Sequence, residues 1–422
     1  MTEPAAAPPR PEAPPPAALP EGSRDVLAVE AGELTVIERA LSGVFDRFGY
    51  REVRTPVLEL AAVLDRAQEG GLGQVFRLFD DRGRVLVMRP DLTIPASRLI
   101  ATRMADHPGP VRVSYLSRAF RPPPAGRAAA AEQLQAGLEL VGPGGPAADA
   151  EALAALVEGL RASGLGDFGV AIADVSLTQA VLDGARVPGE AQAELRRALA
   201  ERDFVAWRRI AEVLRPPGPA GELLADLPAL RGPGALERVA AAVPAAEAAC
   251  ARLGRVLELL AVHGAIDPVM VDLGVLRDWP YYSGVVFEAY APGAGAPIAM
   301  GGRYDGLAAR FGRPRPAVGF AIALDLLHRA VVAAGASDRG ARPGVVLVGG
   351  LEEEVAAAAA ARVAGLAVIA VPDEPGWGEA LAAADGWRYV ARRDGAGYLV
   401  HDRLRGVTVA CDRLEEALTS AT

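Results

Sequence analysis

The 422-residue chain contains no lysine: all 44 positions that count as lysine or arginine are arginine. A phosphate-binding P-loop needs its lysine, and Schiff-base catalysis needs a lysine amine. Both classes of enzyme are therefore excluded. The net charge of −9 also disfavours a broad nucleic-acid-binding surface, although a local basic stripe is compatible with an acidic chain.

Cysteine and histidine are scarce as well. Cys250 and Cys411 lie far apart, and the 4 histidines show no metal-ligand spacing. We therefore expect no disulfide framework, no metal site and no other cofactor. No run reaches the roughly 18 apolar residues of a membrane-spanning helix, and the N-terminal residues lack the apolar core of a signal peptide. The expected location is cytoplasmic, without membrane contact.

The hydrophobic content of 51% is high enough for a full core, and the length predicts two or three domains. Residues 1–22 are rich in Pro and Ala and are expected to form a disordered tail. A core over 23–334, a linker over 335–343 and a C-terminal α/β domain over 344–422 follow. Within the core, residues of about 176–262 are predicted to form a helical insertion.

Periodicity predicts the main elements of the core. We expect an amphipathic helix over 33–50, a hairpin of strands 75–79 and 85–88, strands at 111–115, 134–141, 269–273, 284–290 and near Ile298, a glycine-rich turn at 301–306, a helix over 318–334, and largely helical structure over 147–264. Because side chains alternate along a strand, Gln135, Gly137 and Glu139 share one face, which can line a pocket. A βαβ pattern follows at 345–348, 352–364 and 367–371.

Six segments occur in a fixed order along the chain: LPEGSRDVL, GYREVRTPVLE, MRPDLT, QLQAGLELVG, YYSGVVFEAY and GGRYDGL. Over residues 19–330 this order resembles histidyl-tRNA synthetase, and it agrees best with the regulatory subunits of ATP phosphoribosyltransferase, which are synthetase-like but do not charge tRNA. The resemblance implies an α+β fold of the class II synthetase type. Such a fold has an antiparallel sheet flanked by helices, here with a helical insertion and a small C-terminal α/β domain.

The resemblance also implies a site for free histidine, which needs anions for its ammonium group, a cation for its carboxylate and a hydrogen-bonding partner for its imidazole. Asp91 and Thr93 match the positions that meet the amino group, with Gln135 nearby. Glu139, Tyr282 and Tyr304 match positions on the imidazole side, and Arg121 and Arg277 match cations on the carboxylate side. Tyr281 is a further candidate for histidine binding.

Each of these residues also has a purely structural interpretation. Asp91 can cap a helix, Glu139 can form a salt bridge on a strand face, and the tyrosines can be core residues with a satisfied hydroxyl. The nucleotide side of the resemblance is incomplete. Residues 122–124 are all proline where the synthetase loop has a glutamate and commonly another cation, and Leu326 stands where a second phosphate-binding arginine is expected, although Arg127 can still reach a phosphate.

The resemblance thus implies a non-catalytic regulatory subunit. Its partner would be a short-form ATP phosphoribosyltransferase catalytic subunit, and its ligand L-histidine, the feedback inhibitor of the first step of histidine biosynthesis. A homodimer formed through the segment near Pro56, inside a larger hetero-oligomer, is expected. The alternatives are a divergent histidyl-tRNA synthetase, and a synthetase-like module that binds RNA or another protein. We do not expect tRNA binding by residues 344–422.

Overall fold

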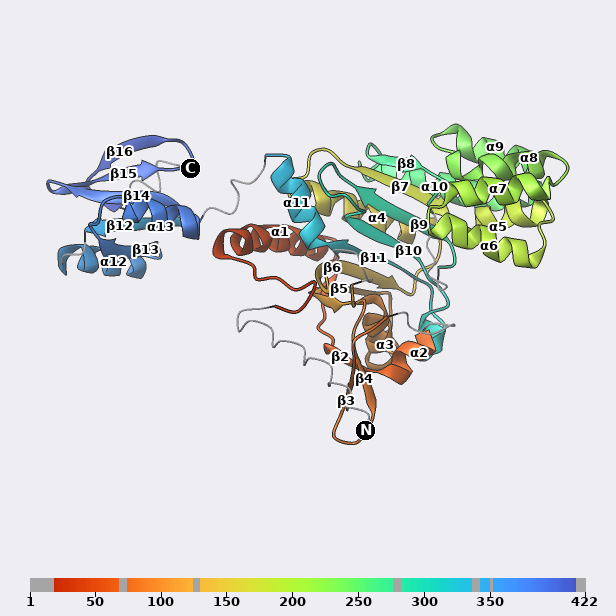
Figure 1. The fold of residues 1–422 in the computed structure, drawn as a ribbon, viewed down its shortest axis with the longest axis horizontal. Coiled ribbons are helices and arrows are strands. Elements are labelled where there is room, and N and C mark those ends of the chain that lie inside the picture. Colours follow the sequence, from red (N-terminus) through yellow and green to blue (C-terminus); the bar gives the residue numbers. More distant parts are fainter. Residues whose placement is uncertain are drawn as a thin grey trace, which may run out of the picture.

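The computed structural model describes residues 19–67, 74–123, 130–275, 282–335, 342–349 and 352–414. Its strands form sheets of eight, five and three strands. The eight-stranded sheet belongs to the core, and the five-stranded sheet to the C-terminal residues, drawn in blue in Figure 1. The candidate site lies on the eight-stranded sheet.

The eight-stranded sheet has the order β1-β5-β6-β11-β10-β9-β7-β8. Its inner pairs are antiparallel, whereas β1 with β5 and β7 with β8 are parallel. The predicted antiparallel sheet is therefore confirmed at its centre and mixed at its edges. The strands are β1 (Arg51–Glu52), β5 (Val111–Phe120), β6 (Glu132–Val141), β7 (Gly169–Asp174), β8 (Val269–Val271), β9 (Val285–Tyr290), β10 (Ala299–Arg303) and β11 (Ala317–Ala323).

Helices α1 (Ala28–Arg47), α4 (Pro146–Ala162) and α11 (Leu324–Ala333) pack on one face of this sheet (Figure 1). The predicted amphipathic helix is α1, which begins earlier than expected and ends at Arg47, before Gly49 with φ 82°. Glycine tolerates this left-handed conformation after a helix end. The buried residues of α1 that join the core are Leu34, Ile37, Leu41, Val44 and Phe45.

Three segments differ from the sequence predictions. The helix predicted over 318–334 begins only at Leu324, because residues 317–323 form the central strand between β6 and β10. The glycines at 301–302 lie in β10 rather than in a turn. Strand β7 interrupts the region predicted to be helical, because a short apolar run that is buried on both faces carries no periodicity to distinguish strand from helix.

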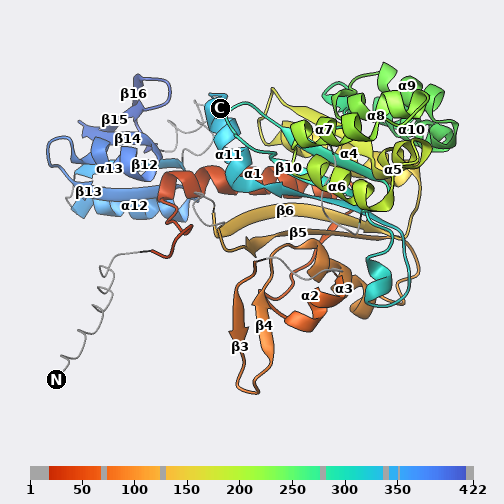
Figure 2. The same cartoon turned by 45° about the vertical axis from the view of Figure 1, so that its right-hand side comes forward.

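A three-stranded sheet projects from the core, as Figure 2 shows. It consists of β2 (Leu58–Leu60), β4 (Val85–Met88) and β3 (Arg77–Phe79), and the predicted hairpin of β3 and β4 is confirmed. The carboxylate of Asp80 closes the turn by accepting hydrogen bonds from the backbone N–H groups of Arg82 and Arg84, at 3.0 and 2.8 Å. Helices α2 (Ala61–Ala67) and α3 (Thr93–Arg103) lie beside this sheet.

Helices follow one another between β7 and β8, drawn in green in Figure 1. They are α5 (Val175–Gly184), α6 (Gly189–Ala200), α7 (Phe204–Leu214), α8 (Pro219–Asp226), α9 (Gly234–Ala242) and α10 (Glu247–Val262), with short 3-10 turns at Leu227–Ala229, Pro244–Ala246 and, after β10, Ala308–Arg310. No helix in the described ranges is both long and apolar enough to cross a bilayer. The same residues contain no group of three or more His, Cys, Asp or Glu side chains that could hold a metal ion.

The C-terminal residues form the predicted βαβ unit and three further strands. Strand β12 pairs in parallel with both β13 and β14, in the sheet order β13-β12-β14-β15-β16. Strand β12 begins at Arg342, within the predicted linker over 335–343, and residues 336–341 of that linker lie outside the described ranges. The elements are β12 (Arg342–Gly349), α12 (Glu352–Val363), β13 (Ala367–Pro372), α13 (Trp377–Asp385), β14 (Trp387–Asp394), β15 (Gly397–Asp402) and β16 (Val407–Cys411).

Residues 19–22 of the predicted N-terminal tail lie within the described part of the chain. The backbone N–H of Ser23 donates to the carbonyl of Pro20 at 3.0 Å, and the N–H of Ala131 donates to the carbonyl of Gly22 at 2.9 Å. Gly22 therefore binds the residue that precedes β6, whereas residues 1–18 lie outside the described ranges.

Candidate functional site

Glu139 lies in the middle of the large sheet, on the face away from α1 and α4, because its neighbours Leu138 and Leu140 face the core under these helices. Its strand, β6, pairs Glu139 with Val113 on one side and Gly319 on the other. The side chain is fully buried. The hydroxyl of Tyr115 donates to Oε1 at 3.2 Å, and the hydroxyl of Tyr304 donates to Oε2. Two aromatic hydroxyls thus fix a carboxyl group inside the protein.

Glycines on the same face provide the space for this group. A Cβ atom at Gly319 would lie 1.8 Å from Oε2 of Glu139, and one at Gly137 would lie 2.6 Å from the hydroxyl of Tyr115. A Cβ atom at Gly302 would lie 2.9 Å from Cε1 of Tyr282. Any other residue at these positions would displace the polar side chains, so the glycines shape the site.

Burial has a large effect on Glu139, because a charged carboxylate is poorly stabilised away from water. Desolvation raises the pKa of Glu139 to about 8, against the opposing hydrogen bonds of Tyr304, Thr93 and Tyr115. The negative charge of Asp91 raises this pKa further. At neutral pH Glu139 therefore holds a proton that it can share with a ligand.

Asp91 precedes α3 and has two different oxygen environments. Oδ1 accepts a hydrogen bond from the backbone N–H of Ile94 at 2.8 Å, so the helix-capping interpretation is correct for this oxygen. Oδ2 is buried and has no hydrogen-bond partner among the described residues. Burial raises the pKa of Asp91, while Arg121 lowers it. The cap therefore leaves one carboxylate oxygen available to a donor.

Gln135 supplies a second buried acceptor. Its Nε2 donates to Oε1 of Gln133 at 2.8 Å, while its own Oε1 is buried without a partner in the described part of the chain. A buried acceptor that lacks a hydrogen bond costs about 1–3 kcal/mol. A ligand with several N–H donors, such as an ammonium group, would remove this cost at both Gln135 and Asp91.

Arg121 follows β5 and reaches back toward Asp91. Its Nε donates to the carbonyl of Pro90 at 2.7 Å, and its backbone N–H donates to the carbonyl of Ala131 at 2.9 Å. The side chain is largely exposed, so a carboxylate can approach it from solvent. The structure thus brings Arg121 to the Asp91 end of the site, whereas the predicted residues Arg277 and Tyr281 lie outside the described ranges.

Tyr282 connects the Glu139 site to a neighbouring cavity. Its ring lies against Gly302, and with Ser283 it lines a cavity of about 830 Å³. The opposite wall comes from α5, α6 and the Pro244–Ala246 turn, mainly through Ser176, Thr178, Gln179, Asp183 and Arg196. Glu139 does not line this cavity, which meets the Glu139 site only through Tyr282.

Tyr115 is a site residue that the sequence analysis does not predict. It lies on β5 opposite Gly137, and its hydroxyl bridges Glu139 and the carbonyl of Phe320, both at 3.2 Å. The alternation of β5 places Tyr115 on the same face as Ser117 and Val113, which is a signal that the sequence contains. Its opposition to a glycine becomes visible only once the strand register is known.

The positions that match nucleotide-binding residues of the synthetase carry few charged groups in the described part of the chain. Leu326 packs against the main hydrophobic core. Pro122 and Pro123 follow Arg121, and neither has a backbone N–H to donate. Pro124 and Arg127 lie outside the described ranges. Among the described residues at these matched positions, Arg121 is the cation near the site.

Comparisons with known proteins agree with this architecture. The histidyl-tRNA synthetase family model matches residues 22–327. The chain is 42% identical over 318 residues to the ATP phosphoribosyltransferase regulatory subunit of Moorella thermoacetica, which covers 74% of this chain and 81% of that protein. It is 40% identical over 359 residues to the protein of the same name from Symbiobacterium thermophilum, with coverage of 83% and 90%.

A solved structure from Bacillus halodurans, described as an ATP phosphoribosyltransferase regulatory subunit/histidyl-tRNA synthetase, is also similar. It superimposes with a TM-score of 0.77 at 30% sequence identity, over 90% of this chain and 99% of that chain. The similarity extends through the C-terminal residues as well as the core.

Proposed function

Because the chain belongs to the ATP phosphoribosyltransferase regulatory subunit family, whose core is that of histidyl-tRNA synthetase, we propose that it is a non-catalytic, histidine-binding subunit. Its partner is a short-form ATP phosphoribosyltransferase catalytic subunit, which needs this chain for activity. Bound histidine then inhibits the first step of histidine biosynthesis.

The observation that carries the proposal is the pair of buried acceptors without partners, Asp91 Oδ2 and Gln135 Oε1, in the same site as the buried Glu139. An α-ammonium group offers three donors to such acceptors. Arg121, which binds the carbonyl next to Asp91, supplies the charge for an α-carboxylate. The two ends of a free amino acid are thereby accounted for.

The side chain of the ligand follows from Glu139. A free imidazole has a pKa of about 6.5, and burial raises the pKa of Glu139 to about 8. One proton is therefore shared between the two groups at neutral pH, which favours a short, directional hydrogen bond. An aliphatic side chain would leave Glu139 without a ligand partner, so the site selects an imidazole.

Three residues support a non-catalytic role. Adenylate formation needs cations on the phosphates of ATP to stabilise the charge that develops during transfer. Pro122, Pro123 and the aliphatic Leu326 stand at matched positions and provide none. Efficient activation of histidine is therefore not expected, and the site serves as a sensor.

An exposed apolar surface supports the proposed homodimer within a hetero-oligomer. On the three-stranded sheet that follows Pro56, Leu60 and Leu78 both pair with Leu86 and therefore share one face with Leu58. Leu58, Leu60 and Leu78 are 43%, 38% and 41% exposed. A contiguous apolar face of this kind is typical of a protein interface, and two-fold pairing is the commonest way to cover it.

The test is phosphoribosyl-ATP formation by the short-form catalytic subunit, with and without this chain, across a histidine titration. We expect activity only with both chains, and a decrease as histidine shifts the complex by a coupling free energy of about 1–3 kcal/mol. A lack of stimulation with both chains folded would overturn the proposal. Histidine-dependent pyrophosphate exchange would instead favour a synthetase, and an inhibition curve unchanged by Glu139→Ala and Arg121→Ala would show that the sensor lies elsewhere.

A further inference from the structure

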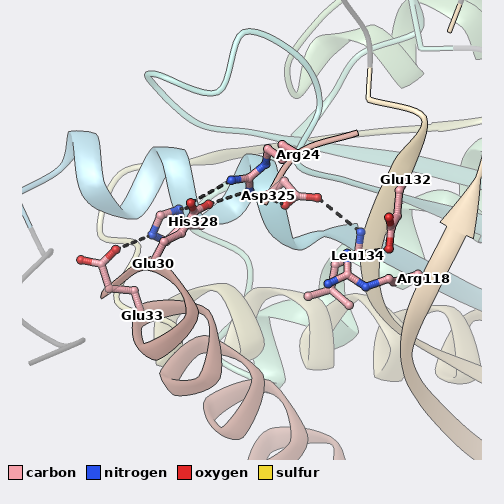
Figure 3. A network of polar contacts seen from close by, with 8 residues as sticks. All are labelled: Arg24, Glu30, Glu33, Arg118, Glu132, Leu134, Asp325 and His328. Carbon is pink, nitrogen blue, oxygen red and sulfur yellow. Dashed lines mark hydrogen bonds and ion pairs between the residues drawn. The ribbon is translucent and has the colours of Figure 1, made fainter. Parts of the chain in front are cut away.

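Figure 3 shows a network of charged residues next to β5 and β6. It lies on the face of β6 that carries Leu134, opposite the face that carries Gln135 and Glu139. Arg24 donates to both carboxylate oxygens of Glu30, at 2.8 and 2.6 Å, and to Oδ1 of Asp325 at 3.1 Å. Asp325 lies in the first turn of α11, and Arg24 precedes α1. The network therefore joins the start of α1 to α11, and Arg24 and Asp325 are 301 positions apart in the sequence.

Asp325 also binds β6 directly. Strand β11 pairs with β6 up to Ala323, whose partner is Gln135, and α11 begins at the next residue. Oδ2 of Asp325 accepts a hydrogen bond from the backbone N–H of Leu134 at 3.3 Å. The carboxylate thus supplies β6 with one more acceptor where the strand ladder ends.

The two faces of this part of β6 have different contacts. Leu134 is part of the core under the helices, and Glu132 forms an ion pair with Arg118 at 2.9 Å. Gln133 and Gln135 lie on the opposite face because side chains alternate along a strand. The contacts of Leu134 and Glu132 on the helix-covered face therefore help to fix the position of the β6 backbone that carries Gln135.

Arg24 extends this control to the other end of the ligand site. It anchors the segment that contains Gly22, whose carbonyl accepts the N–H of Ala131 at 2.9 Å. The carbonyl of Ala131 in turn accepts the backbone N–H of Arg121 at 2.9 Å. Arg121 and Gln135 are thus both held by backbone that the Arg24–Asp325 pair supports from behind.

We propose that Asp325, held by Arg24, is a positioning residue that places Gln135 and Arg121 for the ammonium and carboxylate groups of the bound amino acid. This inference rests on the proposed function, because it concerns the same ligand site. Asp325 lies on the back of the sheet and acts through the N–H of Leu134. Its loss displaces the two end groups of the site and leaves the imidazole partner Glu139 in place.

The experiment measures calorimetric affinities of the full-length chain for L-histidine and for 4-methylimidazole, which lacks both the amino and the carboxylate group. Asp325→Asn is expected to weaken histidine about tenfold, the effect of one well-placed hydrogen bond, and 4-methylimidazole less than about threefold. The matched control is Glu33→Gln. Glu33 binds His328 at 2.7 Å in the same network, and no described contact links it to β6 (Figure 3). It should leave both affinities within about twofold of wild type.

Equal weakening of both ligands by Asp325→Asn, or no weakening, would overturn the positioning role. The double variant Asp325→Asn with Gln135→Ala provides an independent measurement. If Asp325 acts mainly through Gln135, Asp325→Asn should weaken histidine binding little further once Gln135 is replaced. Full additivity of the two losses in binding free energy would contradict the inference. If Asp325→Asn does not fold, Asp325→Glu keeps the charge but moves the acceptor, and the same ligand-selective loss is expected. Wild-type protein that binds no histidine, alone or with the catalytic subunit, would overturn the proposed function itself.

Discussion

The Glu139 site and the surface hollow beside α7 differ in how their polar groups are satisfied. The hollow has a volume of about 510 Å³ and is lined by Phe204, Trp207, Arg208 and Arg209 among others. Its arginines are exposed to water, and the indole N–H of Trp207 already donates to the carbonyl of Leu224 at 2.7 Å. The sheet site, by contrast, contains buried acceptors with no partner among the described residues.

This difference shows why volume alone is a poor guide to function. A hollow whose polar groups are hydrated gains little from a ligand beyond apolar contact. A buried acceptor without a partner already costs free energy in the folded protein, and a complementary ligand recovers that cost. The comparison therefore supports the proposal that the ligand binds at the sheet, and the following changes test it.

The largest effect is expected from Glu139→Ala. Removal of the imidazole partner, which also leaves the hydroxyls of Tyr115 and Tyr304 without this acceptor, should raise the histidine concentration needed for half inhibition by about a hundredfold or more. The measurement is the histidine titration of phosphoribosyl-ATP formation. Glu212→Ala in the hollow beside α7 is the matched control and should leave the curve unchanged. Equal effects of the two substitutions would invalidate the comparison.

Gly319→Ala tests the space that the site requires. The added methyl group would lie 1.8 Å from Oε2 of Glu139 and 2.4 Å from the carbonyl of Leu138, so we expect a loss of about 2 kcal/mol of unfolding free energy, as for other overpacked cores. Gly254→Ala in α10 is the control. A methyl group at this position would meet no heavy atom within 4 Å, and helix propensity should stabilise the variant by roughly 0.5–1 kcal/mol. Urea denaturation distinguishes these opposite signs.

The pH dependence of stability should also identify the buried carboxyl. The pKa of Glu139 is about 8 in the folded protein and has an ordinary value of 4.5. Between these values the folded state keeps a proton that the unfolded state has lost, so this group makes the unfolding free energy fall by about 1.4 kcal/mol per pH unit as pH rises. Glu139→Gln removes this component. Parallel stability curves for the two proteins from about pH 5.5 to 7.5 would contradict the assignment.

The smallest effect is expected in the hollow beside α7. Arg208→Glu combined with Arg209→Glu reverses two exposed charges that line this hollow and not the sheet site. The histidine concentration for half inhibition should change by less than about twofold. The same titration measures it. A change as large as that of Glu139→Ala would show that the hollow, rather than the sheet, receives the ligand.

The sequence predicts which side chains of β6 share a face, because the alternation of side chains along a strand does not depend on distant contacts. Gln135, Gly137 and Glu139 do share a face, and the register of β6 confirms it. The roles of Asp91 and Arg121 in holding histidine stay predictions. Arg277 and Tyr281 lie outside the described ranges.

Other features depend on strand register or on contacts between distant segments. Tyr115 joins the site through its position opposite Gly137, and Asp325 meets Arg24 across 301 positions of sequence. The strand at 317–323 lies where the sequence predicts the start of a helix, because a central strand that is buried on both faces resembles an apolar helix segment in composition. The pairing of this segment with β6 and β10 makes it a strand, and β6 is distant from it in sequence.

The alternation of β6 also bears on how such a chain can change over generations. Leu134, Leu138 and Leu140 belong to the main core, whereas Gln135 and Glu139 on the opposite face are absent from it. Mutations at the second set can alter what is recognised without removing an apolar contact from that core. The recognition face can therefore change while the apolar scaffold is kept, except near Leu134, where the contact with Asp325 couples the two sides of the strand.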